Sequence, residues 1–216
     1  MTEDNSDSAL LIFSRAPVTG QVKTRLQPAL TPEQATEAHI ELTRLTLARA
    51  FEPPLCPVIL YCTPDDGHPF FRQCAREYPL TLAVQRGRDL GERMHLALSD
   101  ALSRYRRVLL MGCDCPSLQA GDLRQALAAL KQGYDAVMAP AEDGGYVLIG
   151  LNKPCPGLFT GIRWGSEQVM ASTRQRARRL GLRWYELATQ WDVDRIDDWI
   201  RYREKTPDDR AFRLMR

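Results

Sequence analysis

Short apolar runs alternate along the chain with longer amphipathic stretches, and this alternation limits the possible folds. Helical patterns lie between most of the apolar runs, and strands that alternate with helices predict an α/β fold with a doubly wound, Rossmann-like, mostly parallel sheet. Ligands of such sheets bind outside the carboxyl ends of the strands. The predicted strands cover residues 9–13, 58–61, 80–84, 108–111, 136–139, 146–151 and 182–187.

Two helix starts are well defined by their capping residues. Thr31 precedes Pro32 and stands three residues before Gln34, which predicts an N-cap, a proline at N1 and a capping box. Asp89 and Glu92 repeat the N-cap pattern before a second helix that reaches Leu102. Further helices are expected over residues 122–130, 166–180 and, more briefly, 196–200.

One pair of predicted strands departs from the parallel pattern. The runs at 136–139 and 146–151 are joined by a loop that is too short for a helical crossover. One of the two strands should therefore be antiparallel, and the sheet mixed.

Length and charge limit the possible classes. A chain of 216 residues is expected to form one domain, here residues 9–204, between a disordered tail at 1–8 and a C-terminal tail at 205–216. The formal net charge of +2 argues against broad nucleic-acid binding. No apolar run is long enough for a membrane span, so a cytoplasmic protein is expected. The spacing of the six cysteines favours neither a zinc site nor a disulfide framework, and the oligomeric state stays open.

The loop after the first strand is a candidate phosphate site. Pro17 and Gly20 break the strand, and Lys23 and Arg25 follow directly. A glycine-containing turn that presents backbone N–H groups beside two cations can hold the phosphates of a nucleotide. Arg15 is a further candidate in the same stretch, and the alternative is an ordinary solvated basic loop.

Two acidic positions are candidate ligands for Mg²⁺ or Mn²⁺, which take oxygen ligands and bridge to diphosphates. Asp114 stands just past the strand at 108–111, and Asp194 follows the last strand. Each has a plainer interpretation as a helix-capping residue.

The segment 141–146 carries candidate catalytic groups. Glu142 or Asp143 would receive the proton of an acceptor hydroxyl, while Gly144 and Gly145 let the backbone approach a substrate. A plain tight turn is the alternative. The three histidines have no partner at ligand spacing and are interpreted as structural, and no dinucleotide, Walker or nucleophile-elbow motif is present.

Five segments, in order along most of the chain, resemble one known group: RAPVTGQVKTRL, DLGERM, MGCDCPSL, PAEDGGYVLIGL and WDVDRIDDW. They are similar to the bacterial family of arsenosugar-biosynthesis-associated or uncharacterised glycosyltransferases, within the GT-A superfamily of nucleotide-diphospho-sugar transferases. The chain departs from that superfamily's pattern at Arg195 and Ile196, where Thr and Pro are usual, and at Cys113, where Ser or Thr is common.

The resemblance implies that Gly20, Lys23 and Arg25 meet the nucleotide phosphates and that Asp114 and Asp194 take the metal-side positions. The expected activity is then metal-dependent transfer of a sugar from an NDP-sugar to a small acceptor. The same superfamily contains nucleotidyltransferases, which release pyrophosphate from an NTP, and that reaction stays open. A non-catalytic nucleotide-binding protein is the remaining alternative.

Overall fold

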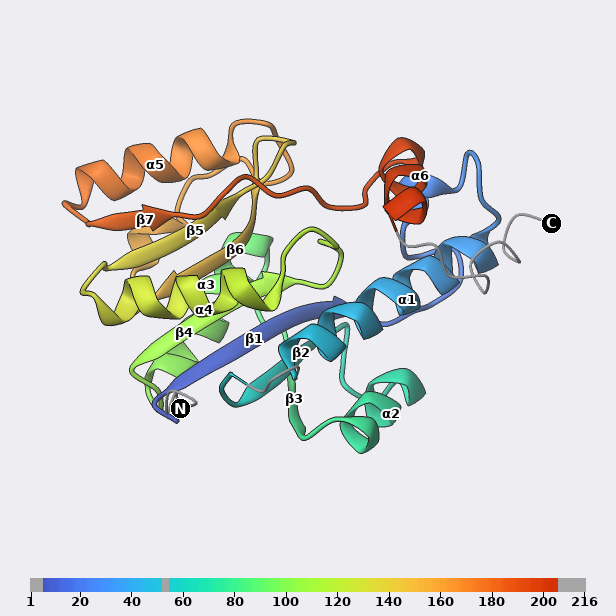
Figure 1. Ribbon diagram of the computed structural model, residues 1–216, viewed down its shortest axis with the longest axis horizontal. Coiled ribbons are helices and arrows are strands. Elements are labelled where there is room, and N and C mark those ends of the chain that lie inside the picture. The colour runs from blue at the N-terminus through green and yellow to red at the C-terminus, as the bar shows by residue number, and fades with distance from the viewer. Residues whose placement is uncertain (1–5, 52–54, 206–216) are drawn as a thin grey trace.

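A seven-stranded mixed sheet forms the centre of the molecule (Figure 1). The computed structural model describes residues 6–51 and 55–205. The strand order is β3-β2-β1-β4-β6-β5-β7, in which β6 is antiparallel to both neighbours and the other pairs are parallel. This confirms the predicted mixed sheet. The strands are β1 Ser8–Arg15, β2 Val58–Thr63, β3 Leu80–Val84, β4 Arg107–Gly112, β5 Ala136–Pro140, β6 Tyr146–Leu151 and β7 Trp184–Glu186.

The expected strand at 182–187 is shortened to β7, where only three residues pair with β5. The predicted tails fall mainly on residues 1–5 and 206–216, which lie outside the described residues. Within the described part, Ser8 already belongs to β1 and Lys205 ends the last helix.

Both predicted helix starts are confirmed by hydrogen bonds. The Gln34 N–H donates to the Thr31 hydroxyl and the Gln34 side chain accepts from the Thr31 N–H, while the Glu92 N–H donates to the Asp89 carboxylate. The helix α2 was not predicted from the sequence; its N-cap is His68, whose ring Nδ1 accepts from the Phe70 N–H. The helices are α1 Pro32–Ala50, α2 Pro69–Glu77, α3 Leu90–Leu102, α4 Ala120–Lys131, α5 Val169–Arg179 and α6 Ile196–Lys205, with 3-10 turns η1 Thr24–Leu26 and η2 Pro156–Leu158.

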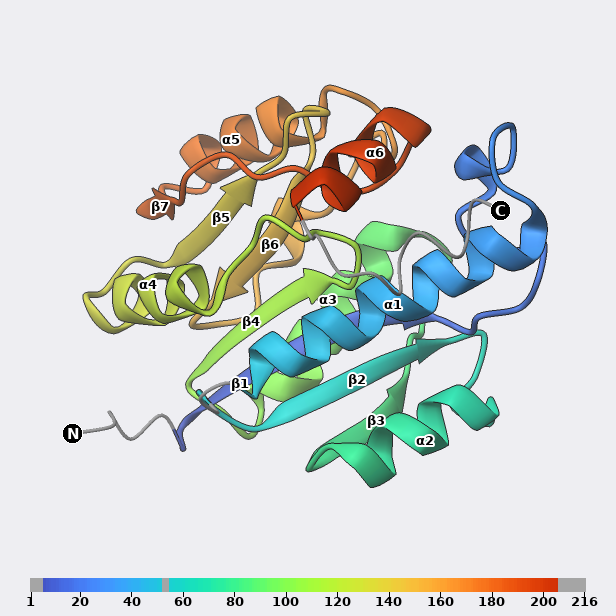
Figure 2. The same cartoon turned by 45° about the vertical axis from the view of Figure 1, so that its right-hand side comes forward.

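Helices cover both faces of the sheet because alternate strand residues point to opposite sides. Leu10 and Ile12 of β1 are buried with residues of α1, α2 and α4, and Leu11 and Phe13 with residues of α3 and α5. In Figure 2, α1 and α4 lie in front of the sheet and α3 behind it. Strands buried on both faces explain why the runs are apolar without alternation.

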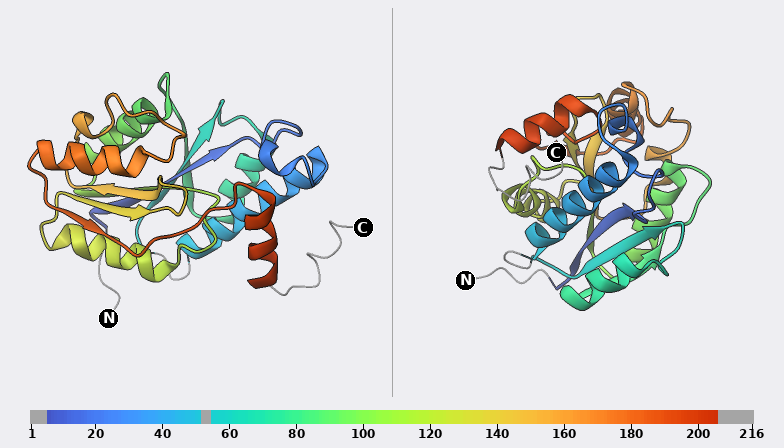
Figure 3. Two further views of the ribbon diagram at one scale, coloured as in Figure 1. Left: turned by 90° about the horizontal axis from the view of Figure 1, so that it is seen from above. Right: turned by 90° about the vertical axis from the view of Figure 1, so that its right-hand side faces the viewer.

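A third, smaller cluster fixes the C-terminal segment beside the start of the chain. Trp199 of α6 and Val193 are buried against Leu26 of η1 and Leu42 of α1. Figure 3 shows α6 beside the loop that follows β1. This packing carries residues 191–194 to the carboxyl end of β1. Among the described residues, no helix is both long and apolar enough to cross a membrane.

Candidate active site at the carboxyl edge of the sheet

Lys23 joins the three parts of the chain that form the site. It lies in the loop after β1 with a φ of 47°, and its Nζ is 3.0 Å from Asp114 Oδ2 and donates to the Val193 carbonyl at 2.5 Å. Only 9% of its side chain is exposed. The structure thus brings together two predicted site residues that are 91 positions apart.

The Lys23–Asp114 ion pair sets the charge of both groups. Partial burial disfavours ionisation of Asp114, but the Lys23 ammonium outweighs it and holds the pKa of the carboxyl below its ordinary value. Burial likewise opposes the charge on Lys23, yet Asp114 raises the pKa of its ammonium. Both groups are therefore charged at neutral pH.

Asp192 is a member of the site that the sequence analysis missed. Burial, followed by the nearby carboxylates of Asp114 and Asp143, raises its pKa to about 7. A partial signal was present in the sequence: Asp192 and Asp194 alternate with the apolar Trp191 and Val193, which the structure buries.

Asp194 pairs with Arg25 instead of joining Asp114. The Arg25 Nη1 donates to Asp194 Oδ2 at 2.7 Å, and with 61% and 41% of the two side chains exposed this pair contributes little stability. Within residues 6–51 and 55–205, no group of three or more His, Cys, Asp or Glu side chains is arranged to hold a metal ion.

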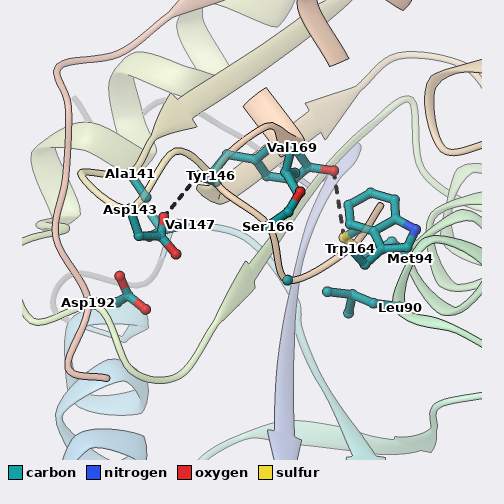
Figure 4. A pocket seen from close by; sticks show the side chains of 12 residues that line it. Leu90, Met94, Ala141, Asp143, Tyr146, Val147, Trp164, Ser166, Val169 and Asp192 are labelled. Carbon is teal, nitrogen blue, oxygen red and sulfur yellow. Dashed lines mark hydrogen bonds between the residues drawn. The ribbon is translucent and has the colours of Figure 1, made fainter. Parts of the chain in front are cut away.

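The two candidate proton acceptors point to different places. Glu142 binds Arg201 of α6 through both carboxylate oxygens, at 2.8 and 3.2 Å. Asp143 accepts from the Gly145 N–H at 2.8 Å and lines a cavity together with Asp192. Figure 4 shows the carboxylates of Asp143 and Asp192 on the same side of this cavity. Of the two candidates, Asp143 is the one placed at the site.

The three candidate glycines have different surroundings. Gly144 has a φ of +86°, and a Cβ there would collide with the Glu167 carbonyl. Gly145 lines the cavity. Gly20 has a φ of +81° and open space where a Cβ would stand. Gly144 therefore holds the turn against the start of α5, while Gly20 shapes the phosphate-binding candidate loop.

Arg15 lies apart from these groups. Its Nη1 donates to the Gln21 carbonyl at 3.2 Å, and it lines a separate pocket with Asp65 and His68. The structure does not place the guanidinium of this predicted phosphate-binding residue beside Lys23 and Asp114.

The comparisons with known proteins identify the family. The family model "Uncharacterized protein conserved in bacteria (DUF2064)" matches residues 46–166. A crystal structure from Desulfovibrio desulfuricans G20, described as a "putative nucleotide-diphospho-sugar transferase", is 33% identical, covers 97% of this chain and 94% of that chain, and has a TM-score of 0.85. The chain belongs to this bacterial DUF2064 family and has the nucleotide-diphospho-sugar transferase fold, which confirms the resemblance seen in its motifs.

Two more distant structures share the fold alone. A CMP:2-keto-3-deoxy-manno-octonic acid synthetase complexed with CTP is 12% identical, with a TM-score of 0.60 over 93% of this chain and 98% of that chain. Rv0371c from Mycobacterium tuberculosis H37Rv in complex with manganese is 18% identical, with a TM-score of 0.55 over 92% and 98%. No curated protein sequence matches the chain significantly.

Proposed function

We propose that this protein is a divalent-metal-dependent transferase that uses a nucleotide-activated donor, and that it moves a sugar from an NDP-sugar to a small acceptor hydroxyl. The observation that carries the proposal is the meeting of Lys23, Asp114 and Asp192 at the carboxyl edge of the sheet, with Asp143 on the adjoining cavity. The name given to the 33% identical relative supports the same donor class.

The carboxylates of Asp114 and Asp192 fit a divalent cation. The raised pKa of Asp192 reflects burial and negative charge that Lys23 does not fully offset, and Mg²⁺ is commonly held by one or two carboxylates plus substrate phosphates. The manganese complex of the M. tuberculosis protein also favours Mg²⁺ or Mn²⁺. When bound, the ion would supply Lewis-acid stabilisation of the departing diphosphate. Asp194 remains a second candidate ligand, available once Arg25 turns to a phosphate.

The positive charges of the first loop suit the donor phosphates. Lys23 is fixed and buried, whereas Arg25 is exposed and free to exchange Asp194 for a phosphate oxygen. In the proposed reaction the acceptor oxygen forms a bond to the sugar carbon, the bond from that carbon to the diphosphate breaks, and Asp143 takes the acceptor proton. The NDP leaves with the electron pair of the broken bond.

A nucleotidyltransferase is the second candidate, because the same cations suit a triphosphate and the synthetase that shares the fold carries CTP. Product analysis separates the reactions. Sugar transfer releases NDP, and nucleotidyl transfer from an NTP releases pyrophosphate. A non-catalytic nucleotide-binding protein would release neither.

The test is an acceptor and donor screen with Mn²⁺ in which NDP and pyrophosphate are both measured. We expect NDP release that is abolished by EDTA, by Asp114→Asn and by Asp143→Asn, with Glu37→Gln, an exposed carboxylate of α1, as the unaffected control. Pyrophosphate release from an NTP without NDP release from any NDP-sugar would replace the first candidate with the second. Full activity in Asp114→Asn would overturn both.

A further inference from the structure

The cavity beside Asp143 has one acidic wall and one apolar wall. These walls limit the class of compound that the cavity can bind. We propose that it binds an uncharged, hydroxyl-rich ring compound, a single sugar or cyclitol without phosphate or carboxylate. Its role as the acceptor site rests on the proposed function, whereas the binding itself does not. The lining residues are Leu90, Met94, Ala141, Asp143, Gly145, Tyr146, Val147, Trp164, Gly165, Ser166, Val169 and Asp192.

The charge of the cavity argues against an anionic ligand. Two carboxylates, Asp143 and Asp192, line it, and none of its described lining residues is Lys, Arg or His. Lys23, the cation that acts on Asp192, is already held by Asp114 and the Val193 carbonyl. A phosphate or carboxylate here would be repelled by these acidic groups and would find no cation among the lining residues. Hydroxyl groups, in contrast, can donate to Asp143, and to Asp192 where no ion is bound to it.

The opposite wall is apolar and firmly built. Figure 4 shows Trp164, Met94 and Leu90 across the cavity from the two carboxylates. The indole of Trp164 rests on Gly91 at the start of α3, where a Cβ would collide with the ring, and it meets Tyr146 edge to face, with ring centroids 6.4 Å apart. An aromatic face held in this way can cover the C–H face of a sugar ring while the hydroxyls remain directed at the carboxylates.

The size of the cavity favours one ring. Its volume is about 180 Å³, below the range of about 300–1,000 Å³ of sites for drug-sized ligands. A single ring therefore fits better than an oligosaccharide or a lipid-linked acceptor.

The experiment measures binding without turnover. Neutral compounds are titrated beside their own phosphate esters, such as glucose with glucose 1-phosphate and myo-inositol with its 1-phosphate, in the presence of the nucleoside diphosphate and Mn²⁺ and, in a second series, without both. We expect at least one neutral member to bind at least tenfold more tightly than its ester, and Trp164→Ala to weaken that binding about tenfold.

Leu90→Arg places a cation at the rim of the cavity and should shift the preference toward the phosphate esters. Leu180→Arg is its matched control, since Leu90 and Leu180 are both 46% exposed and Leu180 lies outside the lining. Esters that bind wild-type protein as tightly as the neutral compounds, or no saturable binding by any neutral compound, would overturn the proposal. This titration measures binding and not turnover, so it is independent of the product assay. Pyrophosphate as the reaction product would contradict the proposed sugar transfer, whereas the binding result alone decides the ligand of the cavity.

Discussion

Among single residues, the two partners of the Lys23–Asp114 ion pair differ in how much of their side chains is exposed. Removing one partner should therefore lower the free energy of unfolding more than removing the other. Lys23 is 9% exposed and Asp114 40%. Asp114→Asn leaves a buried ammonium without its counterion and should lower the free energy of unfolding by about 2–3 kcal/mol, below the full cost of breaking a buried pair because one partner is half-exposed. Lys23→Met leaves a carboxylate that water can reach, so the loss should be smaller.

Urea unfolding of both variants and of the double variant measures this difference. The double variant should be more stable than Asp114→Asn, because it removes the unpaired charge. A larger loss in Lys23→Met than in Asp114→Asn would show that Asp114, not Lys23, is the group that depends on its partner.

His39 should make the protein sensitive to mild acid. Burial lowers the pKa of this histidine, and its Nε2 lies 2.8 Å from the Arg15 carbonyl, to which the neutral ring donates. Near its ordinary pKa of 6.5 the unfolded chain takes up a proton that the folded chain does not, so this contribution to stability is present above pH 6.5 and is lost as the pH falls below it. The loss is at most about 1.4 kcal/mol per pH unit.

His39→Gln keeps an N–H donor but does not titrate. Between pH 7.5 and 5.5 its free energy of unfolding should fall by about 1 kcal/mol less than that of the wild type. The other two histidines are present in both proteins, so the comparison isolates His39. Equal pH slopes would mean that His39 takes up its proton in the folded state as well.

At the scale of elements, two glycines with the same backbone requirement should respond differently to alanine. Gly20 and Gly144 both have positive φ, but only at Gly144 would a Cβ meet a backbone carbonyl, that of Glu167. Gly20→Ala should cost about 1 kcal/mol, from the left-handed conformation alone. Gly144→Ala should cost about 3 kcal/mol and reduce turnover, because the turn carrying Asp143 must move away from α5.

Thermal and urea unfolding of the two variants, with turnover measured on each, tests the contrast. Similar losses of unfolding free energy at both positions would mean that the segment before α5 moves to make room for a Cβ. Gly144 would then be required only for its positive φ.

The elements that could be predicted from the sequence are those whose signals are local. Double-sided burial makes the strand runs continuously apolar, and Thr31 and Asp89 cap their own helices, so strands and caps were predictable. His68 was missed as an N-cap because a ring nitrogen is an unusual acceptor for this position. The length of β7 was overestimated from its apolar run. The strand is as long as its pairing with β5, which covers three residues.

At the scale of the whole molecule, the site joins the start, middle and end of the chain, and this juxtaposition depends on tertiary packing. The doubly wound topology predicts that Lys23 and Asp114 approach each other, since β1 and β4 are parallel neighbours. The role of Asp192 was not predictable in the same way, because it depends on the burial of Trp199 and Val193 against α1 and η1. The carboxylate of Glu142 binds Arg201 of α6 and so does not line the cavity. Local sequence does not indicate this partner.

A ligand that bridges these three segments should stabilise the whole fold, because only the folded chain assembles them. At a hundred times its dissociation constant, such a ligand adds about 2.7 kcal/mol, which corresponds to a rise in Tm of about 5–10 °C for a chain of this length. We expect a nucleoside diphosphate with Mn²⁺ to give this shift and the nucleoside with Mn²⁺ to give little. The reason is that Lys23 would bind the phosphates and the carboxylates of Asp114 and Asp192 would bind the ion. EDTA and Asp114→Asn should both remove it, whereas Glu37→Gln should retain it. An equal shift from the nucleoside alone, or from the diphosphate in EDTA, would place nucleotide binding away from these residues.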